Sequence, residues 1–177
     1  WLKFFRVCPC AMDELVRSAA GRGNMTMLAD VLNRGGDPDS PDGDGHTALH
    51  HAAVGGYAAA CRKLVKAGAK LDSRTDQGLF TPLHVAARGG HKEVCEVLVK
   101  LKANPEAKSK GGYTCIDIAR RYKQDACAEV LLNACGTARA ASLVAGDSLK
   151  SLAIPVVLVG LILAAVIGLY RQVMKLL

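Results

Sequence analysis

A four-residue pattern recurs along this chain at nearly constant spacing, and it restricts the possible folds more than any other feature. Thr47-Ala48-Leu49-His50 is followed by Thr81-Pro82-Leu83-His84 and then by Thr114-Cys115-Ile116-Asp117. The three threonines are 34 and 33 residues apart. A fixed period of this size is typical of a solenoid, whose repeats bury their apolar faces only against one another. The sequence therefore predicts a stack of helical repeats.

The residues around the first two motifs identify the kind of repeat. The repeat that contains the second motif reads Thr81-Pro82-Leu83-His84-Val85-Ala86-Ala87-Arg88-Gly89-Gly90-His91. The repeat before it, which contains the first motif, has the same alanine pair and glycine pair. Both resemble the ankyrin repeat, whose pattern is D-x-x-G-x-T-P-L-H-x-A-A-x-x-G-H, followed by a second helix and G-A. The resemblance implies an all-α solenoid of helix-turn-helix units whose concave face contacts a protein partner.

Two weaker units flank these repeats. Residues 14–24 resemble a degenerate first unit, and residues 110–136 resemble a fourth unit in which Arg120 replaces a buried alanine. Polar substitution is expected in a terminal repeat, which has no neighbour on one side. We therefore expect about four repeats over residues 13–136, after an N-terminal extension of residues 1–12.

The resemblance implies structural roles for several motif residues. The motif histidine hydrogen-bonds the backbone of the long finger loop, and Pro82 can begin a helix because its missing N–H would be unpaired there. Paired alanines let neighbouring helices approach closely. We expect structural roles for Thr47, His50, Thr81, Pro82, His84 and Thr114.

Two rows of residues on the expected concave face are candidates for partner binding. The residues before the motif threonines are His46, Phe80 and Tyr113, and the matching inner-helix positions are Val54, Arg88 and Arg121. Aromatic residues and arginines dominate the energetics of protein interfaces. In the alternative interpretation, Phe80 and Tyr113 only cover the neighbouring finger.

No catalytic or metal-binding motif is found in the sequence. His46 and His51 lie close to Asp42 and Asp44, but Asp-Gly-Asp-Gly is first of all a turn sequence. Cys8-Pro-Cys10 offers two thiols, which is too few to complete a zinc site. We therefore expect a non-enzyme without a metal, a cofactor or a small-molecule substrate.

Composition restricts the compartment and the partners. The net charge is +7, but acidic residues are interleaved and there is no run of basic residues, so nucleic acid is not an expected partner. Cys61 and Cys95 are 34 residues apart, at equivalent repeat positions. Buried thiols act as small hydrophobic groups, which suits the core of a protein in a reducing compartment.

The segment after the repeats predicts a transmembrane helix. Residues 152–170 contain no charged residue, and a helix of this length extends about 28 Å, close to the hydrocarbon thickness of a bilayer. Gly160, Ala164 and Gly168 are spaced by four, which would let another membrane helix approach. Residues 137–151 are expected to be a linker and residues 171–177 a short tail. The alternative is a buried core helix.

Three functions fit these features. The first is a non-catalytic accessory subunit of a membrane protein complex, with the span packed among other spans and the repeats bound to another subunit. Because the chain begins at Trp1, a presequence could have been removed, which favours an organelle: a thylakoid (with a photosystem) or the mitochondrial inner membrane. The second is a tail-anchored cytosolic adaptor. The third is a fragment of an ankyrin-bearing membrane enzyme.

Overall fold

The computed structural model describes the backbone of residues 9–145 and the side chains of residues 10–136. Over residues 9–145 the chain forms eight α-helices and no strand, which confirms the expected all-α fold. The helices are α1 (Pro9–Gly21), α2 (Met25–Asn33), α3 (Ala48–Val54), α4 (Ala58–Lys66), α5 (Pro82–Gly89), α6 (Lys92–Lys100), α7 (Cys115–Arg121) and α8 (Asp125–Ala145).

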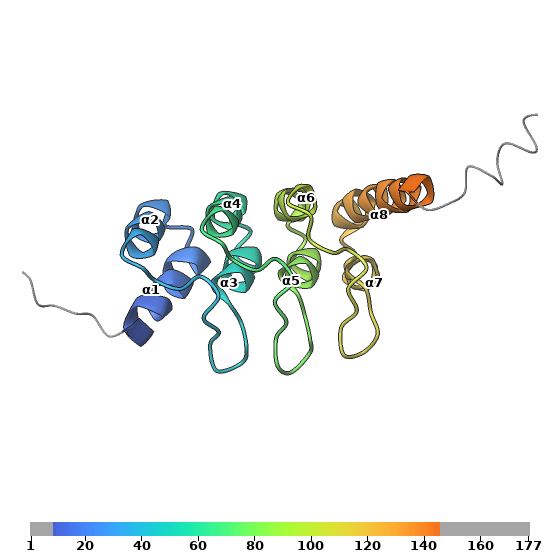
Figure 1. Ribbon diagram of the computed structural model, residues 1–177. Coiled ribbons are helices and arrows are strands. Elements are labelled where there is room, and N and C mark those ends of the chain that lie inside the picture. The colour runs from blue at the N-terminus through green and yellow to red at the C-terminus, as the bar shows by residue number, and fades with distance from the viewer. Residues whose placement is uncertain (1–8, 146–177) are drawn as a thin grey trace, which may run out of the picture. The chain divides into compact units, whose positions relative to one another are not determined.

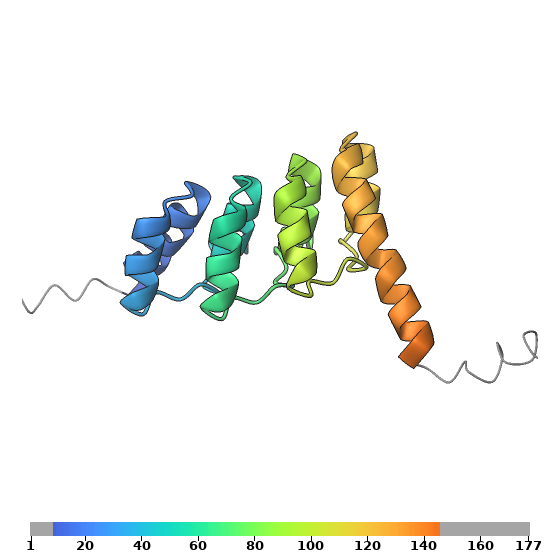
Figure 2. The same ribbon diagram turned by 90° about the horizontal axis from the view of Figure 1, so that it is seen from above.

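Residues up to Cys135 form one compact unit of stacked helix pairs. The inner helices α1, α3, α5 and α7 contact one another in sequence order, and the outer helices α2, α4 and α6 follow the same order (Figures 1 and 2). Three long loops project on the same side of the stack, between α2 and α3, α4 and α5, and α6 and α7 (Figure 1). We call these loops the fingers.

The core consists of leucines and small residues at equivalent positions of successive repeats. Leu49 and Leu83 on the inner helices and Leu64 and Leu98 on the outer helices are fully buried. The alanine pairs of α3 and α5 are also fully buried, as the close approach of neighbouring helices requires. No repeat covers its own apolar surface, so stability depends on stacking.

Cys61 and Cys95 are fully buried in this core, as their spacing predicts. Burial raises the pKa of the Cys61 thiol to about 12, and it raises the pKa of the Cys95 thiol as well. Both groups therefore stay neutral at physiological pH and pack as small hydrophobic side chains.

The inner helices α3, α5 and α7 begin at the motif threonines. Thr47, Thr81 and Thr114 are the N-caps, and each forms a reciprocal capping box with the fourth residue of the motif. In α7 that residue is Asp117, whose carboxylate accepts hydrogen bonds from the backbone N–H and the hydroxyl of Thr114. A capping box satisfies backbone donors that have no partner within the helix.

The finger before α5 contains one extra residue, as the repeat spacing predicts. The residue two positions before the motif threonine has a positive φ in all three fingers: 81° at Gly45, 52° at Leu79 and 78° at Gly112. In the longer finger the N–H of Leu79 donates to the carbonyl of Thr75. The extra residue is thus accommodated in a wider turn, with leucine in a conformation that glycine adopts more easily.

Two expected boundaries differ from the helix ends. Helix α1 begins at Pro9, so the last four residues of the expected extension 1–12 are helical. Helix α8 continues to Ala145, so the expected linker of residues 137–151 is helical over its first nine residues. This part of the chain is rich in alanine, which has the highest helix propensity of all residues.

Among the described helices none is both long and apolar enough to cross a membrane. The expected span of residues 152–170, including Gly160, Ala164 and Gly168, lies outside the described residues, as do Cys8 and the tail of residues 171–177.

Candidate functional site

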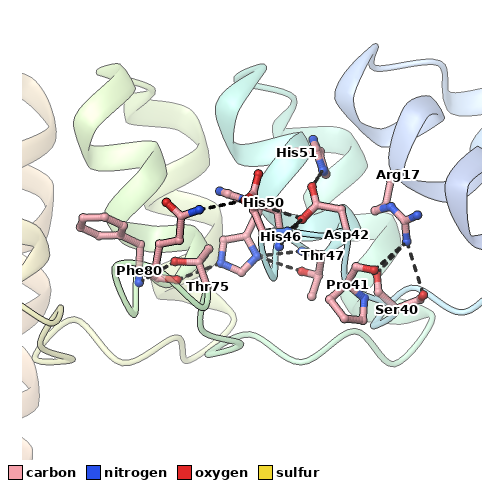
Figure 3. Close-up of polar contacts among 12 residues, drawn as sticks. Arg17, Ser40, Pro41, Asp42, His46, Thr47, His50, His51, Thr75 and Phe80 are labelled. Atoms are coloured by element: carbon pink, nitrogen blue, oxygen red, sulfur yellow. Dashed lines mark hydrogen bonds and ion pairs between the residues drawn. The ribbon is translucent and has the colours of Figure 1, made fainter.

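The motif histidines connect each inner helix to the finger that follows it. The His50 Nδ1 atom accepts a hydrogen bond from the backbone N–H of Thr47 at 3.2 Å. Because a backbone N–H can only donate, the proton of the neutral ring is on Nε2. That nitrogen then donates to the carbonyl of Phe80, 3.0 Å away (Figure 3). His50 therefore fixes the backbone position from which the Phe80 side chain projects.

His84 repeats this arrangement one unit later. Its Nδ1 atom accepts from the backbone N–H of Thr81 at 3.2 Å, and its Nε2 atom donates to the carbonyl of Tyr113 at 3.3 Å. Each of these histidines thus contacts a threonine of its own repeat and the finger of the next one. The two bonds position the aromatic residues of two successive fingers in the same way.

Both histidines are buried and uncharged. Burial lowers the pKa of His50 to about 4, although the hydrogen bond to Phe80 partly opposes the shift. Burial also lowers the pKa of His84. Such rings are poor proton-transfer groups at neutral pH, since they bind a proton only in acid.

Four of the six residues expected to bind a partner line one hollow between α5 and α7. The hollow has a volume of about 190 Å³ and contains Phe80, Arg88, Tyr113 and Arg121. The structure adds three residues that the sequence analysis did not select: Asp117, Ile118 and Tyr122. We call these seven residues the α5–α7 hollow.

The apolar part of the α5–α7 hollow is formed by ring faces and one aliphatic side chain. Ile118 is buried, whereas Tyr113 and Tyr122 remain 47% and 52% exposed. The Phe80 ring is half-buried and meets the His84 ring edge-on, with 6.1 Å between the ring centroids. Large aromatic side chains that stay exposed in a hollow are typical of protein-binding surfaces.

Phe80 and Tyr113 also pack on their own fingers. A side chain added at Gly78 would collide with the Phe80 ring, and one added at Gly111 would collide with the Tyr113 ring. Each ring therefore packs against its own finger. Both rings also line the α5–α7 hollow.

The α5–α7 hollow contains more positive than negative charge. Over residues 10–136, neither Arg88 nor Arg121 forms an ion pair with a carboxylate; the Arg121 guanidinium lies 5.6 Å from the centroid of the Tyr113 ring. The Asp117 carboxylate is occupied by Thr114, and these hydrogen bonds lower its pKa. The hollow therefore offers two guanidinium groups and one carboxylate that already serves a helix cap.

His46 and Val54 lie outside the α5–α7 hollow. His46 Nδ1 is 3.6 Å from Asp42, and His51 Nε2 is 3.0 Å from the other oxygen of the same carboxylate (Figure 3). Val54 is 54% exposed, and its carbonyl accepts a hydrogen bond from His91. A role for these two residues in partner binding remains a prediction, at a place distinct from the hollow.

The cluster around Asp42 has the features of a turn. The carboxylate accepts hydrogen bonds from the backbone N–H groups of Asp44 at 3.0 Å and His46 at 2.8 Å. Burial tends to raise the pKa of Asp42, but these bonds and the contact with His51 outweigh it and lower the pKa. Within the described part of the chain, no group of three or more His, Cys, Asp or Glu side chains is arranged to hold a metal ion.

A signal for Tyr122 is present in the sequence. In the repeats of Thr47 and Thr81, a glycine pair follows the inner helix, at residues 55–56 and 89–90. In the last repeat, Tyr122-Lys123 takes the place of this pair. An aromatic residue in place of a repeat glycine adds a ring at the edge of the stack. This departure from the repeat pattern marks the position as unusual.

Comparisons with known proteins agree with this architecture. The family model described as ankyrin repeats (three copies) matches residues 15–109 and 74–140. The chain is also 40% identical over 58 residues to the human protein named Ankyrin repeat domain-containing protein 39. That match covers 33% of this chain and 32% of the human protein, so the chain spans about a third of the length of this relative.

Proposed function

The chain belongs to the ankyrin repeat family, a family of protein-interaction scaffolds, and on that premise we propose that it is a non-catalytic scaffold of a membrane protein complex. In this proposal the repeats bind another subunit, and residues 152–170 anchor the chain in the bilayer. The partner is a protein, and lipid contacts the anchor alone.

The observation that supports partner binding is the α5–α7 hollow. It combines exposed aromatic rings with two guanidinium groups that have no carboxylate partner over residues 10–136. Residues of these types are the ones whose removal most often weakens an interface. Nothing in the fold of the repeats requires both arginines at this place, because the equivalent position of α3 is Val54.

The membrane part of the proposal rests on sequence. Residues 152–170 have no charge, and Gly160, Ala164 and Gly168 place small residues on one helical face. The neutral buried thiols of the repeats favour a reducing compartment such as the stroma, the mitochondrial matrix or the cytosol. We propose an organellar membrane, thylakoid or mitochondrial, as the location.

Alanine substitution in the α5–α7 hollow tests partner binding. Phe80→Ala and Tyr113→Ala should each weaken the association with co-purifying subunits by about 1–2 kcal/mol, because each removes exposed aromatic surface. The measurement is quantitative mass spectrometry of the complex purified in mild detergent. Leu64→Ala is the matched control, since it destabilises an outer helix without changing the hollow. Equal subunit yields from Phe80→Ala, Tyr113→Ala and the unmodified chain would refute the proposal.

Leucine substitution in the expected span tests its packing role. Gly160→Leu and Gly168→Leu should abolish assembly while the chain stays in the membrane fraction, because they add bulk to the small-residue face and keep it apolar. Assembly is measured by native gel electrophoresis, and membrane association by carbonate extraction. A fully assembled Gly160→Leu, Gly168→Leu double variant would mean that the span is only an anchor, as in an adaptor.

A further inference from the structure

The α5–α7 hollow also carries information about the chemistry of its partner. Its apolar lining consists of buried Ile118 and the rings of Phe80, Tyr113 and Tyr122. The hollow has a volume of about 190 Å³. This space suits one large apolar side chain, which would release weakly held water on entering.

The rim of the hollow is cationic. Arg88 and Arg121 are exposed residues near the ends of neighbouring inner helices, and neither has an ion pair within residues 10–136. A guanidinium group presents paired N–H donors that match the two oxygens of a carboxylate. Two such groups beside an apolar hollow are complementary to a chain segment that has an acidic residue close to an apolar one.

Other charged groups near the hollow add one anion and two cations. Asp117 lines the hollow and stays ionised, since its hydrogen bonds to Thr114 lower its pKa. Arg120 lies near Asp117, and Arg74 lies near His84. A phosphate group has a charge of about −1.5 to −2 at neutral pH, so it would be repelled more by Asp117 and attracted more by the arginines than a carboxylate of charge −1, and phosphoserine peptides belong in the test for this reason.

We propose that the α5–α7 hollow binds an acidic peptide segment of a partner protein, with one large apolar side chain on the ring surface and a neighbouring carboxylate between Arg88 and Arg121. This inference rests on the proposed function, since it names the chemistry of the partner at the same site. Tyr113 supports the arrangement because its ring holds the Arg121 guanidinium close to the hollow.

Peptide binding to the full chain in mild detergent tests the proposal. The probes are fluorescent ten-residue Gly-Ser peptides that contain one Phe or Leu and one Glu, separated by zero to three residues. Matched peptides carry Gln for Glu, Ala for the apolar residue, or phosphoserine for Glu. Fluorescence anisotropy at two salt concentrations gives the Kd for each peptide, and anionic phosphatidylserine vesicles serve as a separate probe.

We expect at least one Glu peptide to bind about tenfold more tightly than both its Gln and its Ala counterpart, and to weaken as salt is raised. Arg88→Gln and Arg121→Gln should each abolish this preference for Glu over Gln. Arg62→Gln removes an exposed arginine of the outer helix α4 and should leave the preference unchanged. Circular dichroism confirms that each variant is folded.

Three results would overturn the inference: no Glu peptide preferred over its Gln counterpart, tighter binding of the phosphoserine peptides, or a preference for vesicles that depends on Arg88 and Arg121. These outcomes are distinguishable from failure of the proposed function. If Phe80→Ala still releases the co-purifying subunits while no Glu peptide is preferred, the hollow binds a partner of different chemistry. If Phe80→Ala releases nothing, the proposed function itself is wrong.

Discussion

At the scale of single residues, His50 and His84 are buried polar side chains that connect neighbouring repeats. Each ring lies within the stack and connects a threonine of its own repeat to a carbonyl of the next finger. Both nitrogens are therefore satisfied only when the ring is neutral and the two repeats are in register. A buried polar group with all its partners is stabilising, whereas loss of one partner leaves an unpaired group.

Acid should destabilise the repeats before their carboxylates are protonated. The folded state lowers the pKa of His50 from 6.5 to about 4 and also lowers that of His84, so below pH 6.5 the unfolded chain binds more protons than the folded chain. The free energy of unfolding should then fall as the pH drops below 6.5, by up to about 1.4 kcal/mol per pH unit for each histidine, and for His50 this fall continues to about pH 4. Urea titrations of a fragment of residues 1–136 measure this slope.

The His50→Gln variant is the control for this prediction. It should be less stable at pH 7 and should lose less stability on acidification, because one of the two titrating rings is absent. An unfolding free energy that stays constant from pH 6.5 to 4 in the unmodified fragment would contradict the prediction, since it would mean that the folded rings accept protons as readily as the unfolded ones.

At the scale of secondary-structure elements, the ends of the inner helices differ between repeats in one informative way. The chain leaves each inner helix through a residue with positive φ, at 65° for Gly23, 74° for Gly56, 75° for Gly90 and 57° for Lys123. Glycine adopts this conformation without steric penalty, whereas a residue with a Cβ atom is strained there. The last repeat therefore keeps the geometry of the others with a less suitable residue.

Two substitutions at these helix ends should have opposite effects on stability. Gly90→Ala should lower the free energy of unfolding by about 1–2 kcal/mol, because φ is positive and a residue with a Cβ atom is strained in this conformation. Lys123→Gly should raise it by up to about 1 kcal/mol, because the strained residue is replaced. Thermal melts of the fragment of residues 1–136 compare the two. A destabilising effect of Lys123→Gly would show that the lysine side chain contributes more than its backbone strain removes.

At the scale of the whole molecule, the compact unit up to Cys135 is a row in which each helix pair is stabilised by its neighbours. The inner helices α1, α3 and α5 each contact the outer helix of their own repeat, and the inner helices contact one another in the order α1, α3, α5 and α7. Stability in such an arrangement is close to a sum of repeat and interface terms, and a terminal repeat has one interface instead of two. Opening should therefore begin at the ends of the row.

Leucine truncation should reveal this gradient. Leu83→Ala, in the fully buried interior, should cost about 2–5 kcal/mol and destabilise the whole row. Leu131→Ala, equally buried but on α8, should mainly increase exchange in the last repeat, because that repeat can open alone. Hydrogen exchange measured by mass spectrometry distinguishes the two patterns. Uniform loss of protection in Leu131→Ala would indicate that the unit up to Cys135 opens as one cooperative block.

The repeat fold could be predicted from the sequence, because the information for each repeat is local. The threonine cap, the motif histidine and the alanine pair lie within a few residues of one another. The pattern recurs every 33 or 34 residues along the chain. Helix positions, buried leucines and buried thiols could therefore be predicted without knowledge of long-range contacts. The extra residue in the finger before α5 could also be predicted from the repeat spacing, whereas the positive φ of Leu79 could not.

Which candidate residues meet depends on contacts between repeats. His46, Phe80 and Tyr113 are equivalent in sequence, as are Val54, Arg88 and Arg121, but only the last two of each row line the hollow between α5 and α7. The reason is that the shape of a surface depends on the side chains of two neighbouring repeats together, and here Ile118 and Tyr122 of the last repeat complete it. The length of α8 has a local cause instead: the helix continues past the end of the last repeat to Ala145 because this part of the sequence is rich in alanine.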